Sequence, residues 1–209
     1  MVALPAFDAL PLFPLNTVVF PGGHLALKVF EARYLDLMGR CLRSAEPFGV
    51  IALLQGAEVG TDTPRLEMAG CGVLARIDEI DAEQAGILLV RCTGLQRFRL
   101  LEAPSQQPDG LWTARATRLA DDAPAPLEPA LAGTAEGLSR LAARLEAKAQ
   151  PLPWKGPARF DDAGWVANRW CELLPVPVAT RQKLLELDDA AARLRLVDEF
   201  LRNRGILKA

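Results

Sequence analysis

The chain has 209 residues, of which 50% are hydrophobic, and its 24 basic residues nearly balance its 26 acidic ones. This composition is typical of a globular protein with enough chain for one large domain or two small ones. The net charge of −2 gives no electrostatic basis for binding nucleic acid or an anionic membrane. The single histidine, His24, excludes every metal or catalytic site that needs two histidines.

The four cysteines lie far apart in the sequence, so they form neither a zinc-binding pair nor a Cys-x-x-Cys redox motif. We interpret them as small buried hydrophobic residues in a reducing cytoplasm. The N-terminus lacks the basic segment of a signal peptide. The uncharged stretch 9–27 has the length of a membrane span, but its prolines and glycines are unfavourable in a membrane helix. The sequence therefore predicts a cytoplasmic protein without a membrane partner.

The first part of the chain is predicted to form strands and one helix. Residues 10–15 are extended, and because Pro11 and Pro14 would interrupt a hydrogen-bond ladder, we expect them at a sheet edge or a barrel rim. A Pro-Gly-Gly turn follows at 21–23. The next predicted elements are a strand over 24–29, an amphipathic helix over 31–43 and a buried strand over 48–54.

Beyond a polar loop at 55–65, the pattern is that of several strands separated by turns. Gly94 is expected to turn the chain between two of them. The strands predicted here cover residues 72–80, 87–92, 95–100 and 112–117. Short strands with frequent turns indicate a small barrel or folded sheet, and one helix crossing between strands is compatible with it.

After residue 118 the sequence becomes proline-rich and then helical. Helices are predicted over 131–149, 161–174 and 180–187, followed by a last helix that ends before Gly205. The expected N-caps are Asp161 or Asp162 for the second helix, Thr180 for the third and Asp188 for the last. The predicted fold class is α+β: a β-rich subdomain over 1–118, a connector over 119–130 and an α-helical subdomain over 131–209.

Motifs for catalysis and for phosphate binding are missing. The segment nearest to a nucleophile elbow, residues 137–141, lacks the second glycine and lies within a helical pattern. A P-loop requires a Gly-Lys pair, which occurs nowhere in the chain. We therefore expect no catalytic residue, no metal and no cofactor.

Three of the four tryptophans, Trp154, Trp165 and Trp170, fall in the helical part. They are interpreted either as core residues or as an aromatic surface that binds a segment of another chain. Trp154 lies in a loop flanked by prolines and a glycine, so we expect it to be the most exposed of them.

The block Leu-Pro-Leu-Phe-Pro-Leu at 10–15, with the hydrophobic run that ends in Phe-Pro-Gly at 20–22, resembles the opening of the N-terminal domain of Lon proteases. The resemblance continues through Val-Phe-Glu-Ala-Arg-Tyr at 29–34, which is more similar to the short, stand-alone members than to the long proteases. Weaker resemblances follow in order at 72–77, 94–100, 183–188 and 193–194.

This resemblance implies a PUA-like β-barrel followed by a helical bundle. It also implies that the domain binds substrate polypeptide for a separate ATPase and protease. Because the chain carries neither a P-loop nor a Ser–Lys protease domain, we expect a non-catalytic module that binds polypeptide or a partner protein, and we do not expect ATP-dependent peptidase activity.

The binding surface is expected where the barrel and the helices meet. Its expected residues are Trp154, Phe160, Trp165, Gly22, Gly23 and His24. Two alternatives stay open. A PUA-like barrel binds RNA in other proteins, and here Arg97, Arg99, Arg115 and Arg118 would form a basic stripe on the strands. A small-molecule site in the barrel would require a deep polar pocket around His24.

Overall fold

The computed structural model describes residues 6–55 and 66–207, so the loop expected at 55–65 lies almost wholly outside the described residues. The chain divides into two compact units, Met1–Asp121 and Asp122–Ala209. The boundary between the units lies within the segment that the sequence analysis assigns to a connector.

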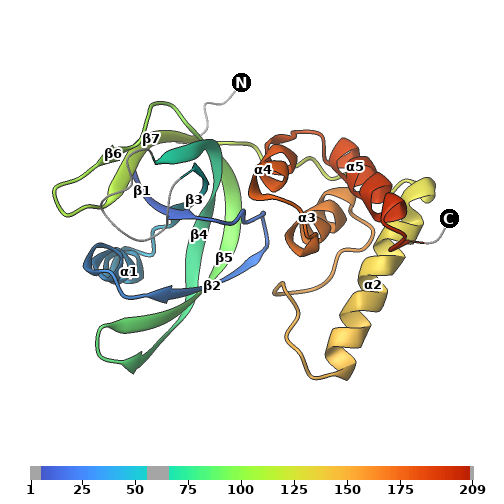
Figure 1. Cartoon of the computed structure of the whole chain (residues 1–209), viewed down its shortest axis with the longest axis horizontal. Coiled ribbons are helices and arrows are strands. Elements are labelled where there is room, and N and C mark those ends of the chain that lie inside the picture. The colour runs from blue at the N-terminus through green and yellow to red at the C-terminus, as the bar shows by residue number, and fades with distance from the viewer. Residues whose placement is uncertain (1–5, 56–65, 208–209) are drawn as a thin grey trace. The chain divides into compact units, whose positions relative to one another are not determined.

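The first unit is a β-barrel that carries one helix (Figure 1). A closed ring is formed by β1 (Ala6–Leu15), β3 (Phe48–Gln55), β4 (Glu67–Gln84), β5 (Ile87–Leu100) and β7 (Trp112–Arg118). The ring closes because β5 pairs with both β4 and β7. Two further strands, β2 (His24–Val29) and β6 (Ser105–Gln106), are added to β5 and β7. The predicted barrel within an α+β fold is thus confirmed.

Of the two positions expected for the proline-containing strand, a sheet edge or a barrel rim, the sheet edge is wrong, because β1 lies between β3 and β7. The two neighbours, however, pair with different stretches of β1. Pro11 is registered with β7 before the pairing with β3 begins, and Pro14 is registered with β3 after the pairing with β7 has ended. Leu12 alone is registered with both strands. Each proline therefore has a β neighbour on one side only, which leaves the other side for its missing N–H.

Gly94 does not turn the chain, because β5 continues through it from Ile87 to Leu100. The glycine is required for a close approach instead. A Cβ atom at Gly94 would lie 2.6 Å from the carbonyl oxygen of Phe20 and 2.9 Å from Cγ1 of Val19. The backbone of β5 therefore passes directly against the segment that leads into β2.

The helix α1 (Ala32–Ser44) packs on the barrel through the face that its periodicity predicts, with Tyr34, Leu37, Met38 and Cys41 buried. The ring of Tyr34 stacks on that of Phe13 in β1, with ring centroids 4.1 Å apart. The guanidinium of Arg33 donates to the carbonyl oxygen of Gly110 at 3.0 Å. The stacked rings hold the start of α1 beside the end of β1, and the hydrogen bond joins it to the loop that leads into β7.

The second unit is helical, as predicted. It comprises α2 (Ala132–Ala147), α3 (Ala163–Leu173), α4 (Val178–Glu186) and α5 (Ala190–Asn203), preceded by the 3-10 helix η1 (Pro129–Leu131). The helix α3 is its core element, because most of its residues are buried and it packs against α2, α4 and α5. Figure 1 shows it beside α4 and α5.

The helix starts confirm one predicted cap and correct two. Asp162 caps α3, where its side chain accepts hydrogen bonds from the N–H groups of Gly164 and Trp165. The third helix begins two residues before Thr180, with Pro177 at its N-cap, so Thr180 lies within the first turn. Asp189 rather than Asp188 caps α5, since the Asp189 carboxylate accepts from the backbone of the first turn.

Candidate functional site

The three aromatic residues singled out in the sequence form one cluster in the helical unit. The ring of Trp165 meets Trp154 edge to face with centroids 5.2 Å apart, and it meets Phe160 in the same way at 5.5 Å. Trp165 lies in the first turn of α3, so the Asp162 cap that starts this helix also positions the ring. Phe160 and Trp165 are partly exposed.

The prediction that Trp154 is the most exposed tryptophan is wrong, because only 4% of it is accessible. The flanking prolines and glycine predict a loop, but they do not say which way the side chain points. The indole turns inward onto Trp165, and its Nε1 has no hydrogen-bond partner among the described residues. Trp170 is also buried and donates to the carbonyl oxygen of Thr134 at 3.0 Å. Both tryptophans are core residues of the helical unit.

The other expected site residues, at 22–24, form a structural turn in the barrel unit. Gly22 has φ 76°, and its N–H donates to the carbonyl oxygen of Gly94 at 2.8 Å. The N–H of Gly94 donates in turn to the carbonyl oxygen of Gly23 at 2.9 Å. His24 begins β2, and its Nδ1 is buried without a hydrogen-bond partner among the described residues. These backbone hydrogen bonds join the start of β2 to β5. The aromatic cluster belongs to the other unit, so the expected binding surface that combines residues 22–24 with the aromatic cluster stays a prediction.

The four arginines considered as an RNA-binding stripe are not all exposed on the surface. Arg97 is 5% exposed. Arg118 donates to the side chain of Gln96 at 3.0 Å and lies over the ring of Phe7. Arg115 is exposed and pairs with Glu102 at 4.0 Å. Binding to a phosphate backbone requires accessible charges, and this face offers fewer of them than the sequence pattern indicates.

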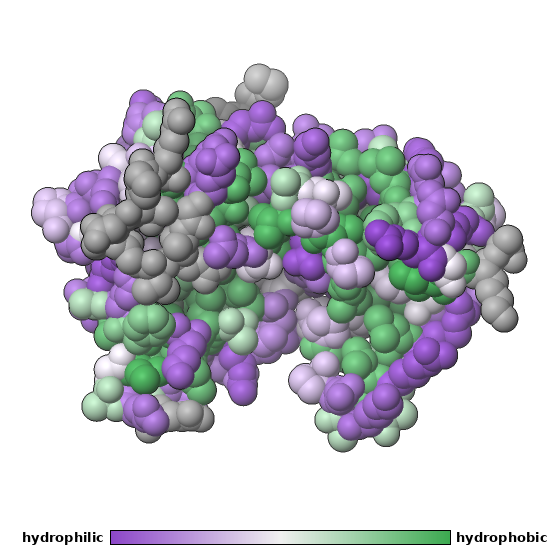
Figure 2. Space-filling model, viewed as in Figure 1, coloured by the Kyte–Doolittle hydropathy of each residue, from purple (hydrophilic) through white to green (hydrophobic). Residues whose placement is uncertain are grey.

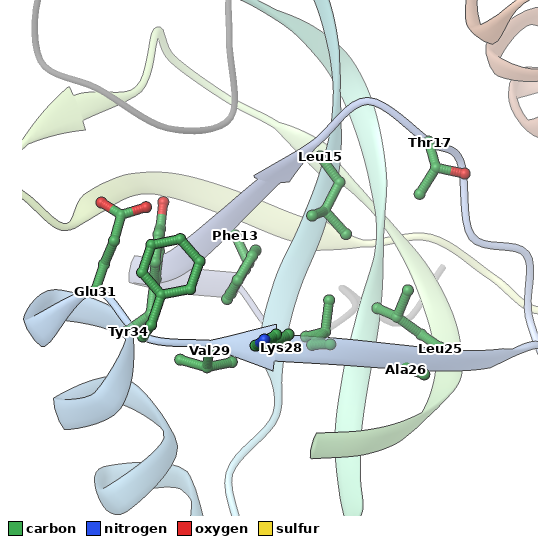
Figure 3. A pocket seen from close by; sticks show the side chains of 11 residues that line it. Phe13, Leu15, Thr17, Leu25, Ala26, Lys28, Val29, Glu31 and Tyr34 are labelled. Atoms are coloured by element: carbon green, nitrogen blue, oxygen red, sulfur yellow. The ribbon is translucent and has the colours of Figure 1, made fainter. Parts of the chain in front are cut away.

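The barrel unit contains a pocket of about 350 Å³ that was not predicted from the sequence; we name it the β2 pocket. Figure 3 shows it between the end of β1 on one side and β2 with the start of α1 on the other. Its lining consists of Phe13, Leu15, Thr17, Leu25, Ala26, Leu27, Lys28, Val29, Phe30, Glu31 and Tyr34. The lining is mostly apolar, and Phe30 at its rim is 49% exposed. The signal for it in the sequence is this large aromatic residue directly after the predicted strand over 24–29.

A second apolar groove of about 320 Å³ lies in the helical unit. Residues that line it include Leu184 of α4 and Leu196 and Phe200 of α5, with Lys183 as its charged member. In the view of Figure 2, apolar residues, coloured green, reach the surface on both units.

The cysteines are free and buried, as expected. Burial raises the pKa of the Cys92 thiol to about 12, and the negative charge of Asp78 adds to this effect. Burial likewise raises the pKa of Cys171 to about 12. Such thiols stay protonated at neutral pH and are poor nucleophiles. Within residues 6–55 and 66–207, three or more potential metal ligands are nowhere grouped together.

In the described part of the chain, every helix is too short or too polar to cross a membrane.

Comparison with protein families gives a match over residues 9–203 to the substrate-binding domain of the ATP-dependent protease La, or Lon. The chain belongs to this family. The match covers both units, the barrel and the helices.

Relatives in this family include the Lon protease of Anaeromyxobacter dehalogenans, which is 28% identical over 206 residues, or 95% of the chain. Lon protease 2 of Myxococcus xanthus is 28% identical over 208 residues, or 96% of the chain. The chain spans 24% of the length of each of these proteases. Among solved structures, a Lon N-terminal domain protein from Xanthomonas campestris is 31% identical with a TM-score of 0.74, covering 93% of this chain and 99% of that one. The N-terminal domain of a Lon protease from the Mycobacterium avium complex shares the fold, with 19% identity, a TM-score of 0.61 and coverage of 94% and 99%.

Proposed function

We propose that this chain is a non-catalytic cytoplasmic module that binds segments of other polypeptides, and that the β2 pocket is its binding site. Membership of the Lon substrate-binding family supports the choice of ligand class. The observation that carries the choice of site is the half-exposed ring of Phe30 beside an apolar pocket of about 350 Å³. Exposed aromatic residues next to apolar hollows are the usual anchors of protein interfaces.

The β2 pocket suits side chains of unfolded polypeptide because its walls are apolar and its edge is polar. Leu15, Leu25 and Phe30 offer aliphatic and aromatic contacts, while Lys28 and Glu31 lie at the solvent boundary. Glu31 is already paired with Arg33. An apolar side chain that enters the pocket leaves water for contacts with these walls, and such burial is the main source of affinity in polypeptide capture.

The test is a titration of this chain into a fluorescently labelled, reduced and carboxymethylated protein that cannot fold, followed by anisotropy. Replacing Phe30 by Ser removes the exposed ring and is expected to weaken binding about tenfold, equivalent to about 1.4 kcal/mol. The matched control is Leu101→Ser, because Leu101 is 52% exposed in the same unit but does not line the pocket. Equal affinities of the two variants and the parent would refute the pocket as the site. No binding by the parent would refute the proposed function.

A second contact surface is proposed at the partly exposed edges of Phe160 and Trp165, which the sequence analysis singled out together with Trp154, Gly22, Gly23 and His24. The same titration with Phe160→Ser tests it. Loss of affinity in this variant, with none in Phe30→Ser, would move the site to the helical unit.

A further inference from the structure

The strand β2 lies at one end of the strand order of the sheet, next to β5. Within the described residues it pairs with β5 alone, through an unbroken register from His24 opposite Thr93 to Val29 opposite Leu88. Every second residue of an antiparallel strand directs its backbone N–H and C=O away from its partner. One edge of β2 therefore carries backbone donors and acceptors that no strand of the described chain uses.

The register shows which residues these are. The N–H of Gly94 donates to the carbonyl oxygen of Gly23 at the position just before His24. Alternation from this bond places the backbone groups of Leu25, Leu27 and Val29 toward β5 and those of Ala26 and Lys28 toward the open edge. The side chains of Leu27 and Val29 are buried, whereas Ala26 and Lys28 are exposed on the other face.

The β2 pocket runs along this open edge. Its lining includes every residue from Leu25 to Glu31. Successive side chains of a strand point to opposite faces of the sheet, so a pocket on one face would touch only alternate residues. A hollow that touches all of them lies beside the backbone. In Figure 3, Phe13, Leu15 and Thr17 stand across from the strand and form the opposite wall.

We propose that the β2 pocket takes an extended segment of another polypeptide as an added strand, hydrogen-bonded to the backbone of Ala26 and Lys28. The proposal rests on the proposed function and names its substrate class: β-prone segments with apolar residues at every second position. One set of side chains then enters the pocket against Leu15 and Leu25, and the other set faces solvent. A helical ligand is excluded, because its backbone groups are already paired within the helix.

The charge at the edge refines this substrate class. Lys28 is exposed, and its ammonium group has no ion-pair partner in the part of the chain that the structure describes. Opposite charges on neighbouring strands attract, and like charges repel. The added strand therefore carries an acidic residue, rather than a basic one, on its solvent face beside Lys28.

The experiment uses a fluorescein-labelled peptide in which valine alternates with threonine and one threonine is replaced by glutamate. Two N-methylated forms are compared with it, one methylated on two valines and the other on two threonines. Only one of the two sets of N–H groups faces β2 in an added strand. We expect one form to bind more than tenfold more weakly and the other to stay within about threefold of the parent peptide.

The outcomes separate this inference from the function on which it rests. Equal affinity of the two N-methylated forms overturns strand addition, even when the parent peptide binds and Phe30→Ser weakens it. Binding of none of the peptides, together with none to the unfolded protein, overturns the proposed function itself. Association of the chain with itself in place of peptide binding, seen as a dimer by sedimentation, also overturns the inference.

Two protein variants complete the test. Ala26→Pro removes an N–H from the open edge. It is expected to weaken binding of the parent peptide more than tenfold and to leave the circular dichroism spectrum of the protein unchanged. Should this variant fail to fold, the pair of N-methylated peptides still decides the question. Lys28→Glu is expected to reverse the preference between the glutamate peptide and a matching lysine peptide, and an unchanged preference contradicts the charge assignment.

Discussion

Inside the helical unit, Nη1 of Arg193 lies 2.6 Å from Oδ2 of Asp122. The same guanidinium donates to the side chain of Asn168 and to the carbonyl oxygens of Leu184 and Leu187. Arg193 is 1% exposed, so its charge is compensated almost wholly by these groups. The residue at the start of the second unit is thereby joined to its last helix.

Asp122→Ala is expected to destabilise the helical unit by about 3 kcal/mol, because it leaves a buried guanidinium without its carboxylate. Urea denaturation followed by circular dichroism measures the change. The neighbouring Asp121 is exposed and accepts a surface hydrogen bond from Gln96. Asp121→Ala should therefore change the free energy of unfolding by less than about 0.5 kcal/mol. Equal effects of the two variants would contradict the role of the pair.

Trp154→Ala is expected to lower stability by about 3 kcal/mol, because the indole is buried against Trp165. Phe160→Ala removes a partly exposed ring from the same cluster and should lower the free energy of unfolding clearly less. The measurement is thermal and urea denaturation of both variants. A Trp154→Ala protein that is as stable as the parent but has lost polypeptide binding would contradict the buried position of this indole. It would support the alternative interpretation, in which Trp154 contacts the bound polypeptide.

Gly94→Ala is expected to destabilise the barrel by about 2 kcal/mol or more, because its Cβ would lie 2.6 Å from the carbonyl oxygen of Phe20. Gly70→Ala is the matched control, since nothing lies within 4 Å of a Cβ at that position of β4. Comparison of their urea midpoints checks the claim. A Gly94→Ala protein as stable as Gly70→Ala would show that the two segments are not in contact.

The buried thiols predict a loss of stability at alkaline pH. Burial raises the pKa of Cys92 and Cys171 to about 12 in the folded state. The unfolded chain loses these protons near the ordinary thiol pKa of about 8.5. The contribution to stability is therefore complete below pH of about 8.5 and falls by roughly 1.4 kcal/mol per pH unit and per thiol as the pH rises toward 12.

Urea denaturation at pH 8 and pH 10 tests this linkage. The parent chain should lose about 2 kcal/mol more over this interval than either Cys92→Ala or Cys171→Ala, because each variant lacks one of the titrating thiols. An identical pH dependence in the parent and both variants would show that the thiols do not carry the effect.

The sequence predicted the barrel and most of its strands because hydrophobic periodicity is a local property. Strand β2 has the predicted bounds, His24–Val29, and Asp162 caps α3 as expected. The errors concern properties that are not local. Prolines predicted an edge for β1, but two partners that pair with different stretches of one strand cannot be inferred from its sequence. Gly94 has the pattern of a turn, whereas its actual role is the contact with a segment more than seventy residues away.

The candidate site was predicted less well than the fold. The clustering of Trp154, Phe160 and Trp165 follows from their closeness in sequence, but the inward direction of Trp154 depends on tertiary packing. The β2 pocket was not predicted, because its walls come from the end of β1 and from β2, which only the fold brings together. The sequence of β2 also does not show that one of its edges has no neighbouring strand in the described chain. In the sequence, the pocket is marked by Phe30, a large aromatic residue directly after the predicted strand over 24–29.

The most direct test of the central claim is an NMR titration of the isotope-labelled chain with the alternating valine–threonine peptide. We predict that the largest amide shifts fall on Ala26, Lys28 and Phe30, with smaller ones on Leu15 across the pocket. Shifts confined to the groove around Leu184, Leu196 and Phe200, or to the cluster around Trp165, would contradict the β2 pocket as the polypeptide-binding site.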